Sequence, residues 1–212
     1  MKPEPRPYRS PLREEHARLT RRRIVHTSAE LFVERGYVAT TIDAIAERAG
    51  VGRKTIFTSV GGKVALLKLA LDWALSGDDE PVAIADRPEM RRMMETDDPH
   101  QLLDAWIEMN ARIAQRVAAL YQVLVVAADS DPEAADLLAT ADGQRIEGAR
   151  AITGRIAALD GLREGLDVAR AADIADVLID PMPYRRLVGT RRWPFKSYVA
   201  ELQRLASESI LR

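Results

Sequence analysis

Apolar residues recur at helical spacing along most of this chain, and strand-like alternating runs are scarce. The first clear stripe is made by Ile24, Leu31 and Phe32, with Ser28 between them, on one face of a helix from about residue 13 to 35. A glycine at residue 36 is well placed to end that helix. Together with abundant alanine and leucine, this pattern predicts an all-α protein.

Two short helices joined by a glycine-containing turn are predicted next. Residues 42–49 carry apolar side chains at i, i+3, i+4 and i+7, so one face of that helix is apolar. A Gly-Val-Gly sequence then interrupts the helix. In the second short helix, residues 53–60, only Ile56 and Val60 are expected to face inward. Such a pair is a helix-turn-helix whose second helix suits the major groove of DNA.

Polar residues mark the start and the outer face of this motif. Thr40 and Thr41 precede the first short helix as candidate N-caps, and Thr40 has capping-box spacing to Asp43. The outer face of the second short helix is predicted to present Arg53, Lys54, Phe57 and Thr58.

The rest of the chain is predicted to be helical as well. A helix over residues 63–76 is apolar on nearly all sides, so it is expected to be packed on nearly all sides. Residues 77–99 are acidic and contain prolines, which indicates a boundary. Further helices are predicted at 99–117, 118–129, 132–159, 168–179 and 194–211. The expected parts are a disordered arm at 1–12, a helix-turn-helix domain at 13–77 and a larger helical domain at 78–212.

Charge is distributed unevenly between the two ends. Residues 1–77 hold 14 Lys+Arg against 8 Asp+Glu, a net +6, whereas residues 78–212 hold 17 against 24, a net −7. This distribution is typical of a protein whose basic first part binds the phosphates of DNA while its acidic body does not contact DNA. Surface charge without a function is the alternative.

The candidate chemistry for catalysis is sparse. The chain has no cysteine, and its three histidines, His16, His26 and His100, are far apart in the sequence. No phosphate-cradling glycine loop or serine elbow is present, and the DxxH spacing of Asp97 and His100 is interrupted by Pro99, which breaks the helical register that a ligand pair would need. Neither a signal-peptide segment nor a membrane-spanning run is apparent. We therefore expect a soluble cytoplasmic protein that is not an enzyme and has no cofactor, metal site, catalytic residue or membrane partner.

A set of residues at fixed spacing runs through the helix-turn-helix. The set is Gly36-Tyr37, Thr40-Thr41, Ile45-Ala46, Ala49-Gly50-Val51, Thr55, Phe57 and Lys63. With these residues, the chain from about residue 22 to residue 75 resembles the DNA-binding region of TetR/AcrR-type transcriptional regulators. Three positions depart from the commonest pattern: Gly52 replaces a serine, Phe57 a tyrosine and Val60 a phenylalanine.

The resemblance implies a homodimeric regulator that binds a palindromic double-stranded DNA operator. Repression relieved by a small-molecule effector of unknown identity is the commonest mode of the family. Arg53 and Lys54, in the first turn of the second short helix, are candidates for base or phosphate contact. The remaining candidate DNA contacts are Thr40, Thr41, Thr55, Phe57, Thr58, Ser59 and Lys63, of which most match family positions that meet the DNA backbone.

An effector pocket in the body is also predicted. An amide at Asn110 interrupts an apolar stripe, so it either bonds a neighbouring helix or faces a cavity that holds a ligand. The pocket predicted on this basis is lined by Trp106, Met109, Asn110, Ile113, Tyr121 and Leu124. Ordinary core packing explains the same pattern.

The last two long helices each have a face of small or apolar residues. Such faces allow close helix approach, and two copies of the pair would make a four-helix bundle. The resemblance also implies dimerisation through the C-terminal helices. Burial within one chain is the alternative. The two faces are Val168, Ala171, Ala172, Ala175 and Leu178, and Tyr198, Val199, Leu202, Leu205, Ala206 and Ser209.

A different class of function also fits the sequence. The departures at Gly52, Phe57 and Val60 would suit an all-helical ligand-binding or scaffold protein whose helix-turn-helix is degenerate and no longer binds DNA.

Overall fold

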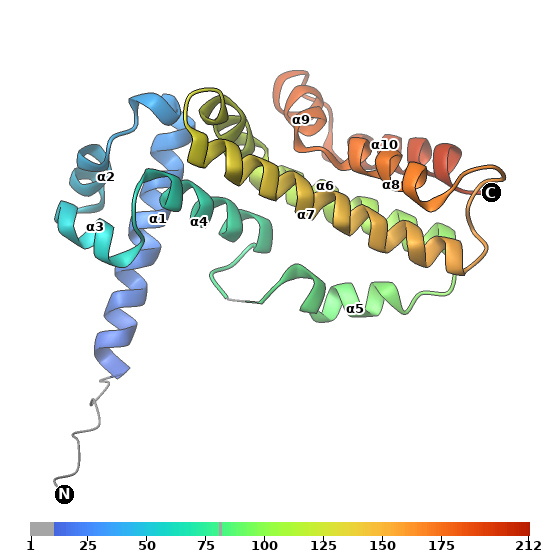
Figure 1. Cartoon of the computed structure of the whole chain (residues 1–212), viewed down its shortest axis with the longest axis horizontal. Helices are drawn as coiled ribbons and strands as arrows, with labels where there is room; N and C mark the ends of the chain where they lie inside the picture. Colours follow the sequence, from blue (N-terminus) through green and yellow to red (C-terminus); the bar gives the residue numbers. More distant parts are fainter. Residues whose placement is uncertain (1–10, 81) are drawn as a thin grey trace, which may run out of the picture. The chain divides into compact units, whose positions relative to one another are not determined.

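The computed structural model describes residues 11–80 and 82–212, and throughout these residues the regular structure is helical (Figure 1). No β-strand occurs in the described part of the chain, so the prediction of an all-α protein is confirmed. Most of the expected N-terminal arm, residues 1–10, lies outside the described residues. The chain forms two compact units, Met1–Ala70 and Leu71–Arg212.

The first unit is built on a long helix and two short ones, drawn in blue to cyan in Figure 1. These are α1 (Pro11–Ala39), α2 (Ile42–Ala49) and α3 (Arg53–Ser59), followed by the start of α4 (Lys63–Ser76). α1 is interrupted at Gly36, whose φ of 77° and ψ of 171° are not helical, and this confirms the predicted break. Side chains from all three helices are fully buried between them: Ile24, Leu31, Phe32, Ile45 and Ile56.

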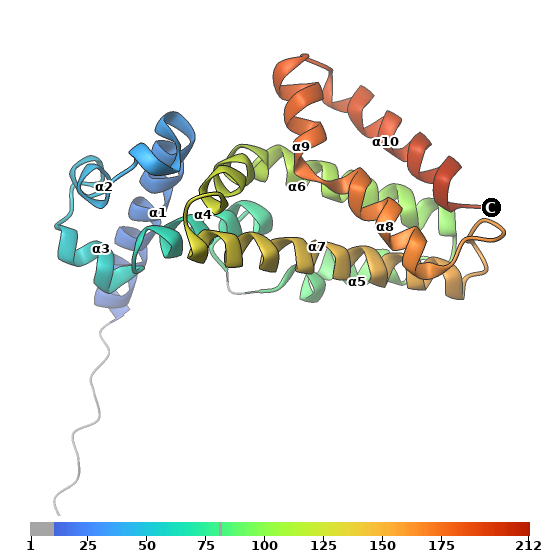
Figure 2. The same cartoon turned by 45° about the horizontal axis from the view of Figure 1, so that its top comes forward.

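The second unit is a larger bundle (Figure 2). Its two longest helices, α6 (Pro99–Ala128) and α7 (Pro132–Ala158), lie side by side. Each begins at an Asp-Pro pair in which the aspartate accepts hydrogen bonds from the first free amides, for example from His100 N to Asp98 at 2.8 Å. The other elements are η1 (Ile84–Asp86), α5 (Pro88–Met94), α8 (Val168–Ile179), α9 (Pro181–Tyr184), the π-helix η2 (Arg185–Thr190) and α10 (Phe195–Ile210).

The predicted division of residues 99–129 into two helices is wrong, because α6 is a single helix of 30 residues. After Pro99 the segment contains neither proline nor glycine, so nothing in it interrupts the backbone hydrogen bonds. By length and composition α6 could cross a membrane, but half of its most apolar 18-residue window is buried inside the protein. It is therefore best described as the central core helix of this unit.

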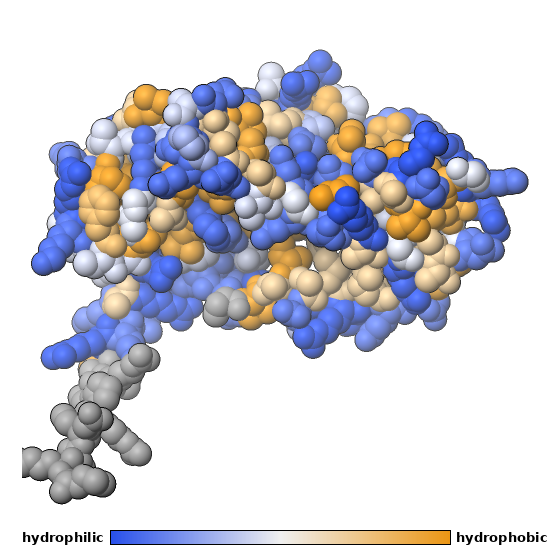
Figure 3. All heavy atoms as spheres, viewed as in Figure 1, coloured by the Kyte–Doolittle hydropathy of each residue, from blue (hydrophilic) through white to orange (hydrophobic). Residues whose placement is uncertain are grey.

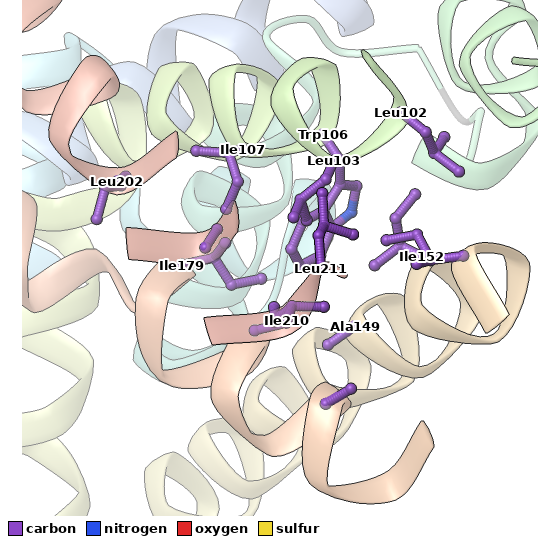
Figure 4. Packing of buried hydrophobic residues seen from close by; sticks show 14 of the residues in the cluster. Leu102, Leu103, Trp106, Ile107, Ala149, Ile152, Ile179, Leu202, Ile210 and Leu211 are labelled. Carbon is purple, nitrogen blue, oxygen red and sulfur yellow. The ribbon is translucent and has the colours of Figure 1, made fainter. Parts of the chain in front are cut away.

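The core of the second unit is formed where α6, α7, α8 and α10 meet (Figure 4). Leu102, Leu103 and Trp106 of α6 pack with Ile152 of α7 and Ile210 of α10. Most residues of the faces that we expected at a dimer interface are buried in this core. The residues of those faces that are buried within the chain are Ala171, Ala172, Ala175, Tyr198, Val199, Leu202 and Ala206. Burial within one chain, the alternative, explains them.

One partly buried charge cluster joins α6, α7 and α8 beside this core. The Arg145 guanidinium lies 2.8 Å from both Asp142 and Asp176, and its Nη1 donates to the Tyr121 hydroxyl at 3.1 Å. Burial, aided by the hydrogen bond to Asp142, raises the pKa of Tyr121 to about 12. Burial opposes the charged form of Arg145, but its hydrogen bonds, the one to Asp176 first, outweigh this and raise its pKa. Tyr121 is thus part of a polar cluster that connects helices.

Candidate nucleic-acid interface

The turn between α2 and α3 is set by local backbone chemistry. Thr41 caps α2, with its hydroxyl oxygen accepting a hydrogen bond from Ala44 N at 3.1 Å. At the other end Gly50 adopts the left-handed conformation, with φ 63° and ψ 41°, and the Val51 amide donates to the Ala46 carbonyl at 3.0 Å. A residue with a side chain would be strained at this φ, so Gly50 fixes the angle at which the chain enters α3.

α3 contributes little to the core and exposes most of its surface. Ile56 is its only buried residue, at 0% exposure. Arg53, Lys54, Phe57 and Thr58 are exposed, as the sequence predicts. Gly52, at the N-cap, offers no side-chain hydrogen bond, so the first amides of α3 lack a side-chain cap. A short helix held by one anchor and presenting cations in its first turn has the form of a DNA-reading helix.

Arg53 is held by a carboxylate of the preceding helix. Its Nη1 lies 2.9 Å and 3.0 Å from the two carboxylate oxygens of Asp43, and its guanidinium carbon is 5.8 Å from the centre of the Phe57 ring. Both charged side chains are more than half exposed, so the pair contributes at most about 1 kcal/mol. This pair was not predicted from the sequence. It orients the arginine, and breaking it would cost little free energy.

Lys63, at the start of α4, is anchored on the end of α1. Its Nζ lies 4.0 Å from the centre of the Tyr37 ring and 3.4 Å from the Val38 carbonyl oxygen. Tyr37 itself is buried and stacks on Phe32 at a centroid distance of 5.8 Å. The aromatic residue after Gly36 therefore positions a cation at the edge of the helix-turn-helix, a role that the sequence alone did not indicate.

Thr40 is not a DNA contact, and this prediction is corrected. The residue is 0% exposed, and its hydroxyl lies 2.8 Å from the Gly36 carbonyl oxygen and 3.0 Å from that of Leu31. Its hydroxyl therefore satisfies carbonyl groups at the break in α1 and does not cap α2. Thr41, the exposed neighbour, provides the cap.

The other predicted contacts gather around α3. Lys54 is exposed, and Thr55 and Ser59 are partly exposed on the same short helix. Phe57 is 47% exposed, which is unusual for a phenylalanine. The Thr58 hydroxyl donates to the Lys54 carbonyl of its own helix at 3.0 Å. With Arg53, Thr41 and Lys63, these residues form one candidate surface on the first unit.

Replacing Thr40 with valine should destabilise the first unit by about 1–3 kcal/mol, because the change keeps the shape but removes the donor that satisfies buried carbonyls. Denaturant unfolding followed by far-UV circular dichroism measures this loss. Thr58→Val is the matched control, since that hydroxyl is exposed and bonds only within its own helix. Equal stability of the two variants would contradict the structural role of Thr40.

The six residues of the predicted effector pocket all lie on α6. A rise of about 1.5 Å per residue puts Trp106 and Leu124 about 27 Å apart along that helix, so they cannot line one compact pocket. The Asn110 side chain donates to the Trp106 carbonyl of the same helix at 2.9 Å, which satisfies the amide locally. The expected pocket is corrected accordingly: the prediction treated residues 99–117 and 118–129 as two helices, whereas they form one continuous helix.

Comparison with known proteins agrees with this geometry. Residues 24–70 match the sequence model of bacterial regulatory proteins of the TetR family. This segment contains α2, α3 and the beginning of α4. No curated protein sequence matches the chain.

Solved structures share the fold over nearly the whole chain. NalD, the secondary repressor of a multidrug efflux pump in Pseudomonas aeruginosa, aligns with a TM-score of 0.69 and 19% identity, covering 92% of this chain and 98% of that chain. A complex of SmeT with triclosan aligns with a TM-score of 0.71 and 18% identity, covering 92% of both chains. A regulator from Saccharomonospora viridis in complex with choline gives 0.69 and 19%, with coverage of 92% and 99%.

These observations define a helix-turn-helix protein with a larger, all-helical second unit. Its residues 24–70 are similar to the TetR family of bacterial regulatory proteins, and its fold is shared with solved TetR-type structures.

Proposed function

We propose that this protein is a sequence-specific, homodimeric DNA-binding regulator, and that each subunit lays α3 in the major groove of a palindromic operator. The observation that supports this most directly is the exposure of Arg53 and Lys54 on a short helix anchored by Ile56 alone. Two copies related by a twofold axis would reach half-sites one helical turn, or a multiple of it, apart.

Two kinds of contact are assigned to the candidate surface. Arg53 and Lys54 read base edges or phosphates from the first turn of α3, since arginine with guanine is the commonest specific pairing. Thr41, Thr55, Ser59 and Lys63 meet the DNA backbone and set the register of the protein on the duplex. Lys63 has three donors, so the ammonium can keep its place on Tyr37 while donating to a phosphate.

Control by a small molecule is assigned to the second unit, and repression relieved by the effector is the mode we propose. SmeT and the S. viridis regulator, which share this fold, have triclosan and choline bound. Within the second unit the last turn of α4 is bonded to α6, because Arg116 donates to the carbonyls of Ala74 and Leu75 at 2.7 Å. An effector that shifts α6 would therefore act on α4, and a coupling of about 1–3 kcal/mol changes DNA affinity about 5- to 150-fold. The expected location is the cytoplasm.

Binding of random-sequence duplex DNA at two salt concentrations tests this function. We expect measurable affinity at about 50 mM salt that falls by orders of magnitude at about 200 mM, because phosphate contacts release counterions. Fluorescence anisotropy of a labelled duplex provides the measurement. Absence of binding at the lower salt concentration would instead favour the ligand-binding or scaffold protein with a degenerate helix-turn-helix.

A further inference from the structure

A group of five cations follows α9 in the second unit. We call it the basic turn, residues 185–196, and its cations are Arg185, Arg186, Arg191, Arg192 and Lys196. From residue 181 to residue 200 there is no Asp or Glu, so this stretch carries a charge of +5. The other residues from 78 to 212 hold 12 Lys+Arg against 24 Asp+Glu. The basic turn is thus a positively charged segment in an otherwise acidic unit.

The cations of the basic turn are exposed and have no carboxylate partner among the described residues. Elsewhere in the second unit, nine arginines lie within 4.0 Å of an Asp or Glu. Pairing is therefore the common arrangement in this body, and the basic turn departs from it. Like charges held close together repel each other, and an anion from outside the chain would relieve that repulsion.

Backbone hydrogen bonds of the basic turn bring two of its arginines next to each other. The π-helix η2 is closed by hydrogen bonds from Arg191 N to the Arg186 carbonyl and from Trp193 N to the Leu187 carbonyl, both 3.0 Å. The backbones of Arg186 and Arg191 are therefore adjacent. Arg192 has a φ of 62°, in the left-handed region that favours glycine, so the arginine occurs there at a backbone cost of about 1 kcal/mol. In Figure 3 the surface near the place where Figure 1 shows α9 has hydrophilic side chains at its tip and apolar ones beside them.

We propose that the basic turn binds a small ligand that carries two or more phosphate groups. Guanidinium groups match phosphate oxygens through paired hydrogen bonds, and a terminal phosphate brings a charge of about −1.5 to −2 and three acceptors. Because charges interact over a screening length of about 8 Å, a compact polyphosphate bound at Arg186 and Arg191, whose backbones are adjacent, can interact with both arginines. Trp193, 37% exposed between Arg192 and Pro194, offers a flat surface for a ring attached to the phosphates.

A small ligand fits this surface better than an extended polyanion. A membrane or a DNA duplex would bring its charge against the surrounding acidic body as well as against the basic turn, and the net −12 of that body would oppose binding. A compact anion would interact only with the basic turn and its charge of +5. This inference is independent of the function proposed for α3, since it concerns a ligand of the second unit.

Isothermal titration of sodium tripolyphosphate into the full chain, at about 50 mM salt and without divalent cations, tests the proposal. We expect a micromolar dissociation constant that rises about tenfold in Arg191→Gln/Arg192→Gln, which loses two charge-assisted contacts. The matched control is Arg163→Gln/Arg170→Gln, two exposed arginines of the same unit outside the basic turn, and it should bind within about twofold of the parent. Failure of the parent to bind, or equal weakening by both double variants, would overturn the proposal.

Three further arms identify the ligand chemistry. Citrate binding as tightly as tripolyphosphate would overturn the assignment to phosphate. ATP binding equally to tripolyphosphate supports recognition of phosphates alone, and tighter ATP binding supports an added contact with Trp193. A loss of duplex DNA affinity in Arg191→Gln/Arg192→Gln as large as its loss of tripolyphosphate affinity would assign the basic turn to DNA and overturn the small-ligand proposal.

If the glutamine variant loses helical content, Arg191→Lys/Arg192→Lys replaces it. Unchanged tripolyphosphate affinity in the lysine variant would contradict paired guanidinium contacts.

Discussion

Replacing Arg53 and Lys54 together with glutamine should weaken binding to the operator by about 100-fold or more. Each contact to a base edge or phosphate from the first turn of α3 contributes about 1–3 kcal/mol. In the free protein Arg53 is bound to Asp43, but that exposed pair contributes at most about 1 kcal/mol and is readily exchanged for DNA. Neither side chain supports the core, so helical content and dimerisation should be unchanged.

The measurement needs an operator, which selection from a random duplex library with the parent protein would supply. Anisotropy titrations of the parent and of each single variant then separate the two side chains. Loss at one base position marks a reading residue, whereas uniform loss with a shallower salt dependence marks a phosphate contact. Arg35→Gln is the control, because it removes an exposed charge of the same unit outside α3. Unchanged affinity and sequence preference in both single variants would contradict the assignment of α3 as the reading helix.

The helix-turn-helix was predictable because its determinants are local in sequence. The apolar spacing of residues 42–49, the cap at Thr41 and the left-handed position at Gly50 each act within one or two turns of chain. Of the two residues predicted to face inward from the second short helix, Ile56 is buried, whereas Val60 lies at the C-cap of α3 and is only partly buried. These features need no knowledge of distant residues.

Contacts between distant residues were not predictable in the same way. Thr40 and Thr41 are both plausible caps in sequence, and only the carbonyls of Leu31 and Gly36 decide that Thr40 is buried. The Arg53–Asp43 pair and the Arg145 cluster depend on how helices are placed against one another. Nothing in the sequence distinguishes Arg145, which becomes partly buried among carboxylates, from the other arginines of the chain.

The body was harder to interpret for a physical reason. An apolar stripe is buried equally well against another helix of its own chain, against a second subunit or against a ligand, and the sequence pattern is the same in each case. The small-residue face of α8 is the clearest example, since Ala171, Ala172 and Ala175 are completely buried within one chain. A dimer interface on these helices must therefore use their remaining exposed sides.

Substitution of Trp106 best distinguishes between two roles of α6, packing in the core and binding a ligand. It is 3% exposed and packs in the core of the second unit with Leu103 and Ile152 (Figure 4). Trp106→Ala should therefore reduce the free energy of unfolding by about 3–5 kcal/mol, through lost burial and the cavity that remains. Trp193→Ala removes the same side chain from a 37% exposed site and should cost about 1 kcal/mol or less.

Denaturant unfolding of the two tryptophan variants, followed by far-UV circular dichroism, distinguishes the interpretations of α6. A loss confined to Trp106→Ala means that its indole fills space that the fold itself requires, so an effector must bind elsewhere or displace core side chains. Near-parent stability of Trp106→Ala would mean that the indole lines space that the fold does not need filled. In that case Trp106 would again be a candidate for ligand contact, and its variant should change the effector response more than the affinity for DNA.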